Sequence, residues 1–210
     1  MDNNLTLPQT IDMFKNISKK IIENEPMLTK TDLQVGDGDH GIGMKTGFKA
    51  VLRMLDEKEQ ATIQELFKNV GMTLIDSMGG ASGVLFGTLF ISGISELERD
   101  DVLTLCGFQK ALNKSIDAIM SRGGAKPGDK TMIDALKPAA DELESSYNSG
   151  CNFKTAAENA YKAAKAGAVK TKNMQAKKGR ARTYREKSVG VPDPGALSVM
   201  LIFEAVYENI

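Results

Sequence analysis

The sequence contains few of the residues that indicate disulfide, redox or zinc chemistry. Among its 210 residues are one histidine, no tryptophan and two cysteines, Cys106 and Cys151. The spacing of the cysteines matches no metal or redox motif, so we expect both to be reduced thiols. No apolar run reaches the roughly 18 to 20 residues of a membrane helix, and lysines interrupt the N-terminal region where a signal peptide would be apolar. These absences predict a soluble, cytoplasmic protein with no membrane partner.

The chain also lacks an excess of charge of either sign. It has 27 basic and 27 acidic residues, for a formal net charge of zero. Proteins that bind nucleic acid or anionic membranes usually carry a basic excess. We therefore expect no nucleic-acid partner.

Alternating runs of β-branched residues, which would indicate strands, are absent as well. Instead, apolar residues recur at helical spacing in eight segments. The predicted helices cover about residues 7–24, 41–57, 62–78, 83–97, 105–121, 131–147, 153–171 and 195–209. Pro138 predicts a bend in the sixth helix or a later start for it. The pattern predicts an all-α fold, a single domain over residues 1–210 with up-and-down amphipathic helices.

The most unusual stretch is the loop at residues 32–43, called the acidic loop below. Its last ten residues contain four glycines, two acids and the only histidine, and Asp32 precedes them. Carboxylates held together repel one another unless a cation lies between them. Oxygen ligands without cysteine suit Mg²⁺, Ca²⁺ or Mn²⁺. An EF-hand does not fit, because the twelfth residue counted from Asp37 is Phe48 instead of glutamate.

Three further loops are rich in glycine or polar residues: residues 79–83, 123–131 and 179–195. In an up-and-down helical domain, alternate loops fall at the same end. The acidic loop and these three are alternate loops, so we expect them to form one site at one end.

The content of the four loops fits a nucleotide. Asp32, Asp37 and Asp39 are candidate Mg²⁺ ligands. Glycine loops and helix N-termini favour phosphate oxygens, and Arg180 offers several donors to phosphate. Met132 or Leu85 could cover a base.

Taken singly, each motif has an ordinary structural explanation. Asp-Gly-Asp is common in solvated turns, a lone histidine is usually structural, and a basic run such as residues 177–187 is usually a solvated face. Residues 123–131 resemble a P-loop, but Asp129 stands as an extra residue before the lysine and no strand precedes the loop. Only the combination of loops is specific.

In their order and spacing, five motifs resemble the nucleotide-binding L subunit of dihydroxyacetone kinases. They are GDGDHG at 36–41, GGASG at 79–83, PGDKTM at 127–132, GRA at 179–181 and DPGA at 193–196. The resemblance runs essentially end to end. It implies an antiparallel barrel of eight helices that binds ADP or ATP at one end through two Mg²⁺ ions.

The resemblance also implies which residues form the site. The implied metal ligands are Asp32, Asp37 and Asp39. The implied nucleotide-contacting positions are His40, Gly41, Ile42, Gly43, Ala81, Ser82, Gly123, Met132, Arg180, Asp193, Pro194 and Gly195. Ile42 and Gly43 stand where relatives often have Leu and Asn, so a backbone contact is expected to replace a side-chain contact there.

A short L subunit resembles the bacterial branch that depends on the phosphotransferase system. In that branch ADP stays bound as a coenzyme, and a phosphohistidine on an M subunit converts it to ATP. The phosphoryl group then passes to dihydroxyacetone, which a separate K subunit holds covalently on a histidine. The resemblance therefore implies that this chain is one part of an enzyme with K and M partners.

Two other functions remain open. The same nucleotide domain occurs in fatty acid kinases, usually at the front of a longer chain. A non-enzymatic module that binds nucleotide and a transcriptional regulator is the second alternative.

Overall fold

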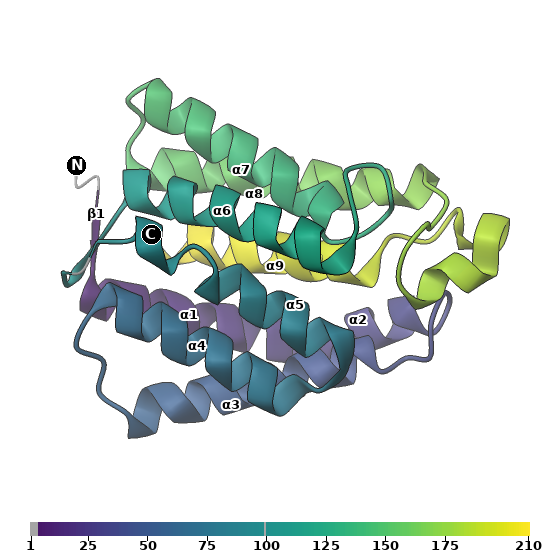
Figure 1. Cartoon of the computed structure of the whole chain (residues 1–210), viewed down its shortest axis with the longest axis horizontal. Helices are drawn as coiled ribbons and strands as arrows, with labels where there is room; N and C mark the ends of the chain where they lie inside the picture. Colours follow the sequence, from purple (N-terminus) through teal and green to yellow (C-terminus); the bar gives the residue numbers. More distant parts are fainter. Residues whose placement is uncertain (1–3, 99) are drawn as a thin grey trace.

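The computed structural model describes residues 4–98 and 100–210, which are mostly helical (Figure 1). The α-helices found there are α1 (Leu7–Glu23), α2 (Glu25–Asp32), α3 (His40–Glu57), α4 (Ile63–Met78), α5 (Gly80–Ile91), α6 (Leu105–Gly123), α7 (Ile133–Asn148), α8 (Phe153–Lys170) and α9 (Pro194–Asn209). Short 3₁₀ helices are η1 (Ile94–Glu96), η2 (Thr171–Asn173) and η3 (Arg180–Ser188). The prediction of an all-helical fold is confirmed.

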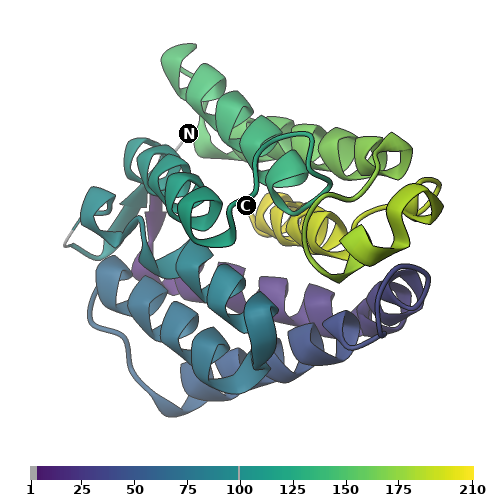
Figure 2. The same cartoon turned by 45° about the vertical axis from the view of Figure 1, so that its right-hand side comes forward.

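The long helices form a closed ring. Each of α3 to α8 contacts the next helix in the sequence, α1 contacts α3, and α9 returns to contact α1. From α3 to α9, successive helices run in opposite directions, as Figures 1 and 2 show. The connections before α3, α5, α7 and α9 therefore lie at one end of the ring, on the right in Figure 1.

The expected count of eight helices is one short, because α2 was not predicted. This helix has only eight residues, starts at Glu25 with Pro26 in its first turn, and shows a weak apolar pattern. It continues from α1 towards the same end of the ring (Figure 1), so the loop order at that end is unchanged.

A small sheet was also not predicted. Strand β1 (Asn4–Thr6) pairs antiparallel with β2 (Val102–Thr104), and Leu5 lies opposite Leu103. Strands of three residues are too short to show a periodic pattern.

Pro138 lies inside α7, which begins at Ile133, later than predicted.

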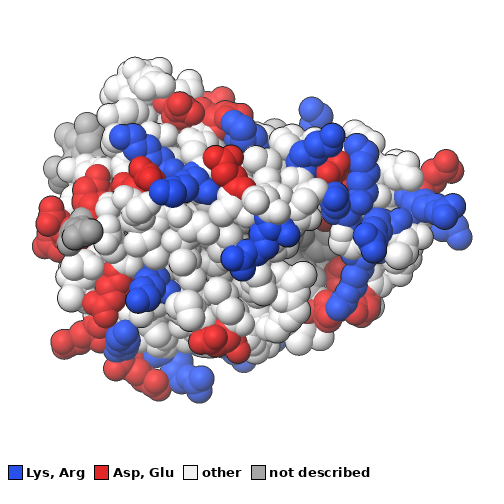
Figure 3. Space-filling model, in the orientation of Figure 1, with Lys and Arg blue, Asp and Glu red and all other residues white. Residues whose placement is uncertain are grey.

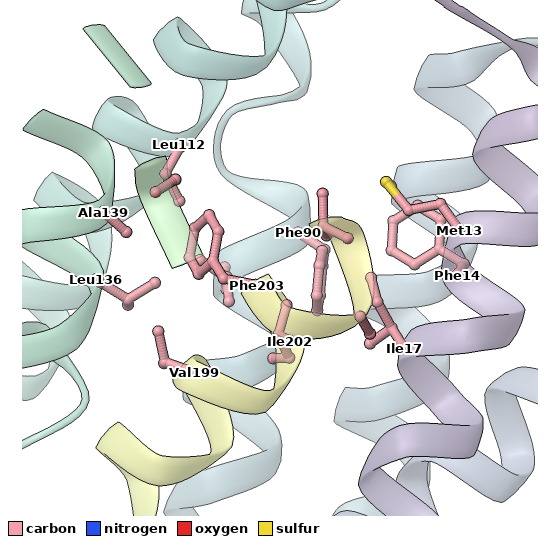
Figure 4. Packing of buried hydrophobic residues seen from close by; sticks show 14 of the residues in the cluster. Met13, Phe14, Ile17, Phe90, Leu112, Leu136, Ala139, Val199, Ile202 and Phe203 are labelled. Carbon is pink, nitrogen blue, oxygen red and sulfur yellow. The ribbon is translucent and has the colours of Figure 1, made fainter. Parts of the chain in front are cut away.

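The core lies inside the ring, where α9 packs against α1, α7 and α8. Val199, Ile202 and Phe203 of α9 lie between side chains of α1 and α7 (Figure 4). On the α1 side, Phe14 packs edge-on against Phe67 of α4 with ring centres 5.0 Å apart. No helix within the described residues has the length and apolar character needed to cross a membrane.

Small residues bring α4 and α5 into backbone contact. A Cβ atom added to Gly71 would lie 2.8 Å from the carbonyl oxygen of Gly87, and one added to Gly87 would lie 2.7 Å from that of Gly71. Such distances leave no room for a methyl group. The pair fixes the two helices that flank the turn at Gly79, and so positions one of the candidate loops.

The Gly87→Ala variant tests this packing, because the close contact decides whether the free energy of unfolding rises or falls. Alanine favours a helix over glycine by roughly 1 kcal/mol, but overpacking costs about 1 to 3 kcal/mol. The difference predicts a net loss of up to about 2 kcal/mol in the free energy of unfolding, measured by urea denaturation. The control is Gly43→Ala in α3, where the nearest atom to an added Cβ is 3.8 Å away. Equal stability changes in the two variants would contradict the close contact.

Candidate functional site

The acidic loop connects α2 to α3 and brings three carboxylates together. Gly38 has a φ of 79° and turns the chain between Asp37 and Asp39, a conformation that glycine adopts without strain. One carboxylate oxygen from each of Asp32, Asp37 and Asp39 lies within 4.8 Å of the other two. The three candidate metal ligands thus form one cluster in space.

This carboxylate cluster needs positive charge. Arg180 supplies some of it here, because its Nη1 lies 2.7 Å from Asp39 Oδ2 and also forms an ion pair with Asp37. Partial burial, and then the charge of Asp32, raise the pKa of Asp39. Three hard oxygen donors at this spacing fit a divalent cation such as Mg²⁺.

Three helices begin at the same end of the ring as the cluster. α3 starts at His40, α5 at Gly80 and α9 at Pro194. Asp193 caps α9, and its Oδ2 accepts a hydrogen bond from the Ala196 N–H at 2.8 Å. Free N–H groups and the helix dipole attract anions at such positions. The surroundings therefore suit phosphate groups next to a cation.

A cavity of about 600 Å³ lies between the four loops. This volume is typical of small-molecule sites. The sequence-predicted residues that line it are Asp32, Asp39, His40, Ile42, Gly43, Ala81, Ser82, Leu85, Met132, Arg180, Asp193, Pro194 and Gly195. Positions more than 150 residues apart in the sequence thus meet at one end of the ring.

Three predicted residues do not line the cavity. The carboxylate of Asp37 belongs to the cluster but lies outside the cavity wall. Gly41 is buried against α2, and an added Cβ would lie 2.5 Å from the backbone nitrogen of Thr29. Gly123 is the exposed last residue of α6.

Several lining residues were not among the predicted ones. Thr46, Met78, Phe86 and Ala181 also face the cavity. Helical periodicity could have found two of them, because Thr46 follows Ile42 by one turn and Phe86 follows Ser82 by one turn.

The side chain of His40 is buried and joins two loops. Its Nε2 lies 2.8 Å from Ser198 Oγ, and the Ser198 hydroxyl donates to the Pro194 carbonyl at 3.1 Å. Burial lowers the pKa of His40, against the opposing effects of Asp32 and the Pro194 backbone. The imidazole therefore connects the start of α3 to the first turn of α9.

Asp193 lies in an environment that disfavours its charge. Burial raises the pKa of Asp193 to about 7, although the Ala196 hydrogen bond opposes this rise. The negative charges of Asp134 and Asp32 add to it. A carboxyl that is partly neutral near pH 7 repels a bound phosphate less than an ionised one.

Basic residues gather at the same end of the molecule (Figure 3). Exposed members of this group, from the connection between α8 and α9, are Lys172, Lys177, Arg180, Arg182, Arg185 and Lys187. In a chain without net charge, this local concentration favours the approach of anionic ligands.

Comparison with known proteins agrees with these features. The DAK2 domain matches residues 34–208. The Escherichia coli K12 protein named "PEP-dependent dihydroxyacetone kinase, ADP-binding subunit DhaL" is 41% identical over 177 residues, which cover 84% of each chain. The Lactococcus lactis protein named "PTS-dependent dihydroxyacetone kinase, ADP-binding subunit DhaL" is 33% identical over 98% of this chain and 99% of its own.

A solved structure shares the fold. The dihydroxyacetone kinase of C. freundii, crystallised in complex with AMP-PNP and Mg²⁺, superposes with a TM-score of 0.73 at 28% identity. The superposition covers 95% of this chain and 33% of that protein, so this chain spans about a third of its length. From the domain match and the extent of similarity, we conclude that this chain belongs to the DAK2 domain family, together with the ADP-binding subunits of dihydroxyacetone kinases.

Proposed function

We propose that this chain is the ADP/ATP-binding subunit of a dihydroxyacetone kinase that depends on the phosphotransferase system. It holds a magnesium nucleotide as a coenzyme and accepts a phosphoryl group from a phosphohistidine on an M subunit. It then passes the group to dihydroxyacetone on a K subunit, giving dihydroxyacetone phosphate. One observation carries this proposal: Asp32 and Asp39 of the carboxylate cluster line the same cavity as three helix N-termini.

The carboxylates are the proposed metal ligands. Asp32, Asp37 and Asp39 would hold two Mg²⁺ ions, since oxygen donors from aspartate are the ligands that Mg²⁺ prefers. A bound ion neutralises phosphate charge during transfer and reduces the repulsion between phosphate and the cluster. Without it, bringing a nucleotide di- or triphosphate next to the cluster would be unfavourable.

The helix starts are the proposed phosphate-binding groups. The proposed donors to phosphate oxygens are the backbone N–H groups of Gly41, Ile42, Ala81, Ser82 and Gly195, which lie in the first turns of these helices. The N–H groups of His40, Gly43 and Asp193 already donate within the chain, and Pro194 has none. Arg180 already lies at the cluster, and its guanidinium can turn to a phosphate once a metal ion replaces it at the carboxylates. Met132 and Leu85, which line the cavity, are the proposed contacts to the base, and Gly123 stays a proposed nucleotide-contacting position outside the cavity wall.

Catalysis on this chain would come from positioning and from charge. Phosphoryl transfer requires the donor and acceptor oxygens to be in line and the developing negative charge to be neutralised. His40 is buried and its Nε2 is bonded to Ser198, so we assign it the role of orienting the start of α3. Any proton transfer at the sugar belongs to the K subunit.

The Asp37→Asn variant tests the metal site. Replacing one carboxylate ligand removes charge that Mg²⁺ requires, so we expect Mg²⁺-dependent ADP affinity to fall at least about tenfold. Isothermal titration with and without Mg²⁺ measures this. Asp141→Asn, an exposed change on α7, is the control and should bind as the wild type does. An unchanged Mg²⁺-dependent affinity in Asp37→Asn would show that the cluster is not the metal site.

Reconstitution with purified partners tests the reaction. With K and M subunits, a phosphorylated M subunit and catalytic amounts of ADP, we expect dihydroxyacetone phosphate to accumulate over many turnovers per ADP. Omission of this chain should abolish the product, because neither partner then has the nucleotide. Acyl phosphate formed beside a fatty-acid carrier, with no sugar phosphate, would favour the fatty acid kinase alternative instead. Nucleotide binding with no turnover in either mixture would favour a regulatory module.

A further inference from the structure

Lys130 is a buried cation in the loop between α6 and α7. Only 1% of its surface is exposed. Burial lowers the pKa of Lys130, and the charge of Asp193 opposes this effect. A buried ammonium is costly unless polar groups surround it. Lys130 forms no ion pair within the described part of the chain, so its partners must be other groups.

Those partners are three backbone carbonyls. The ammonium donates to the carbonyl oxygens of Met174 at 3.0 Å, of Val191 at 2.6 Å, and of Ser188. All three belong to residues 174–191, which we call the arginine segment. An ammonium has three donors, and each one here has an acceptor. Lys130 thus connects the first residue of the segment, Met174, to Ser188 and Val191 at its other end.

The backbone at Lys130 supports this interpretation. Its φ is 60°, a left-handed conformation that is unusual for a residue with a long side chain. Such a conformation persists where surrounding contacts over-determine it. Two further hydrogen bonds connect the same loop to the same segment. Lys177 N–H donates to the Asp129 carbonyl at 3.1 Å, and Lys177 Nζ donates to the Gly128 carbonyl at 3.1 Å.

The far side of the arginine segment reaches the acidic loop. Arg180 contacts Asp39 and Asp37, and the Tyr184 hydroxyl donates to the Gly36 carbonyl at 3.1 Å. The segment therefore spans the cavity mouth from Lys130 to the carboxylate cluster. Most of its exposed residues are polar or charged, with Val189 as an apolar exception, so polar contacts are the main ties that hold it in place.

We propose that Lys130 is a positioning residue whose buried ammonium holds the arginine segment, so that Arg180 is presented to the carboxylate cluster and to the phosphates of a bound nucleotide. Lysine suits this task because its flexible stem lets one ammonium meet carbonyls from several directions. The phosphate part of the inference rests on the proposed function. The tie between Lys130 and the segment does not, and it can be tested on the nucleotide-free protein.

The first test is amide hydrogen exchange of the nucleotide-free Lys130→Met variant. Methionine keeps a long side chain but leaves three carbonyls without a donor. We expect the amides of Ala176, Lys177 and Gly190 to exchange at least about tenfold faster, while amides of α3 and α8 keep their wild-type rates. Lys137→Met removes an exposed lysine from α7 and is the control, with no change expected.

The second test is a double-mutant cycle on ADP binding with Arg180→Ala. If Lys130 acts through Arg180, Lys130→Met should weaken ADP binding roughly tenfold in the wild-type background and have little effect once Arg180 is gone. A lysine that merely supports the fold would weaken binding equally in both backgrounds. Failure of the proposed function would appear as absence of ADP binding in the wild type, and it would leave the exchange result intact.

Each outcome decides the question. Unchanged exchange in the arginine segment, or equal losses in both backgrounds, would overturn the proposal. Lys130→Gln retains two donors and should give an intermediate exchange rate if Lys130→Met does not fold. Global unfolding of both variants would show that Lys130 supports the whole chain, and would overturn the specific role as well.

Discussion

The structure depends on how one end of the helical ring balances its charges. Three aspartates lie within 4.8 Å of one another, next to helix starts that attract anions. Carboxylates and phosphates can share this space only with cations between them. The chain places two of its own cations there: Arg180 on the exposed side of the cluster, and Lys130 buried behind the segment that carries Arg180. A metal ion would add to this arrangement when a nucleotide binds.

The ring of helices provides the rigid support that this balance requires. The attraction between the aspartates and nearby cations stabilises the site only if the backbone holds these groups close together. Backbone contact between Gly71 and Gly87 fixes α4 against α5, and the buried His40–Ser198 contact connects α3 to α9. The first contact is between the helices that flank Gly79, and the second is between the helices that follow the acidic loop and residues 179–195. The core thus contributes to the site by fixing where three helices start, and the loops supply the chemistry.

Helical periodicity was sufficient to predict most of the architecture, because each long helix buries an apolar face that recurs in its own sequence. It failed where the signal was short. α2 has eight residues and a weak pattern, and the β1–β2 pair joins segments about 100 residues apart through three residues each. Counting loops still gave the correct end of the ring, because α2 continues in the direction of α1 and does not reverse the chain.

The sequence by itself determined the composition of the site: which loops carry acids, glycines and Arg180, and at which end they gather. Only the tertiary structure decided what each side chain does there. Gly41 allows α3 to approach α2, His40 is turned inward to Ser198, and Lys130 joins the two ends of the arginine segment. Spacing along a helix is set by the local backbone, whereas the distance between residues 40 and 198, or 130 and 191, is set by how all the helices pack. A sequence motif contains no information on that packing.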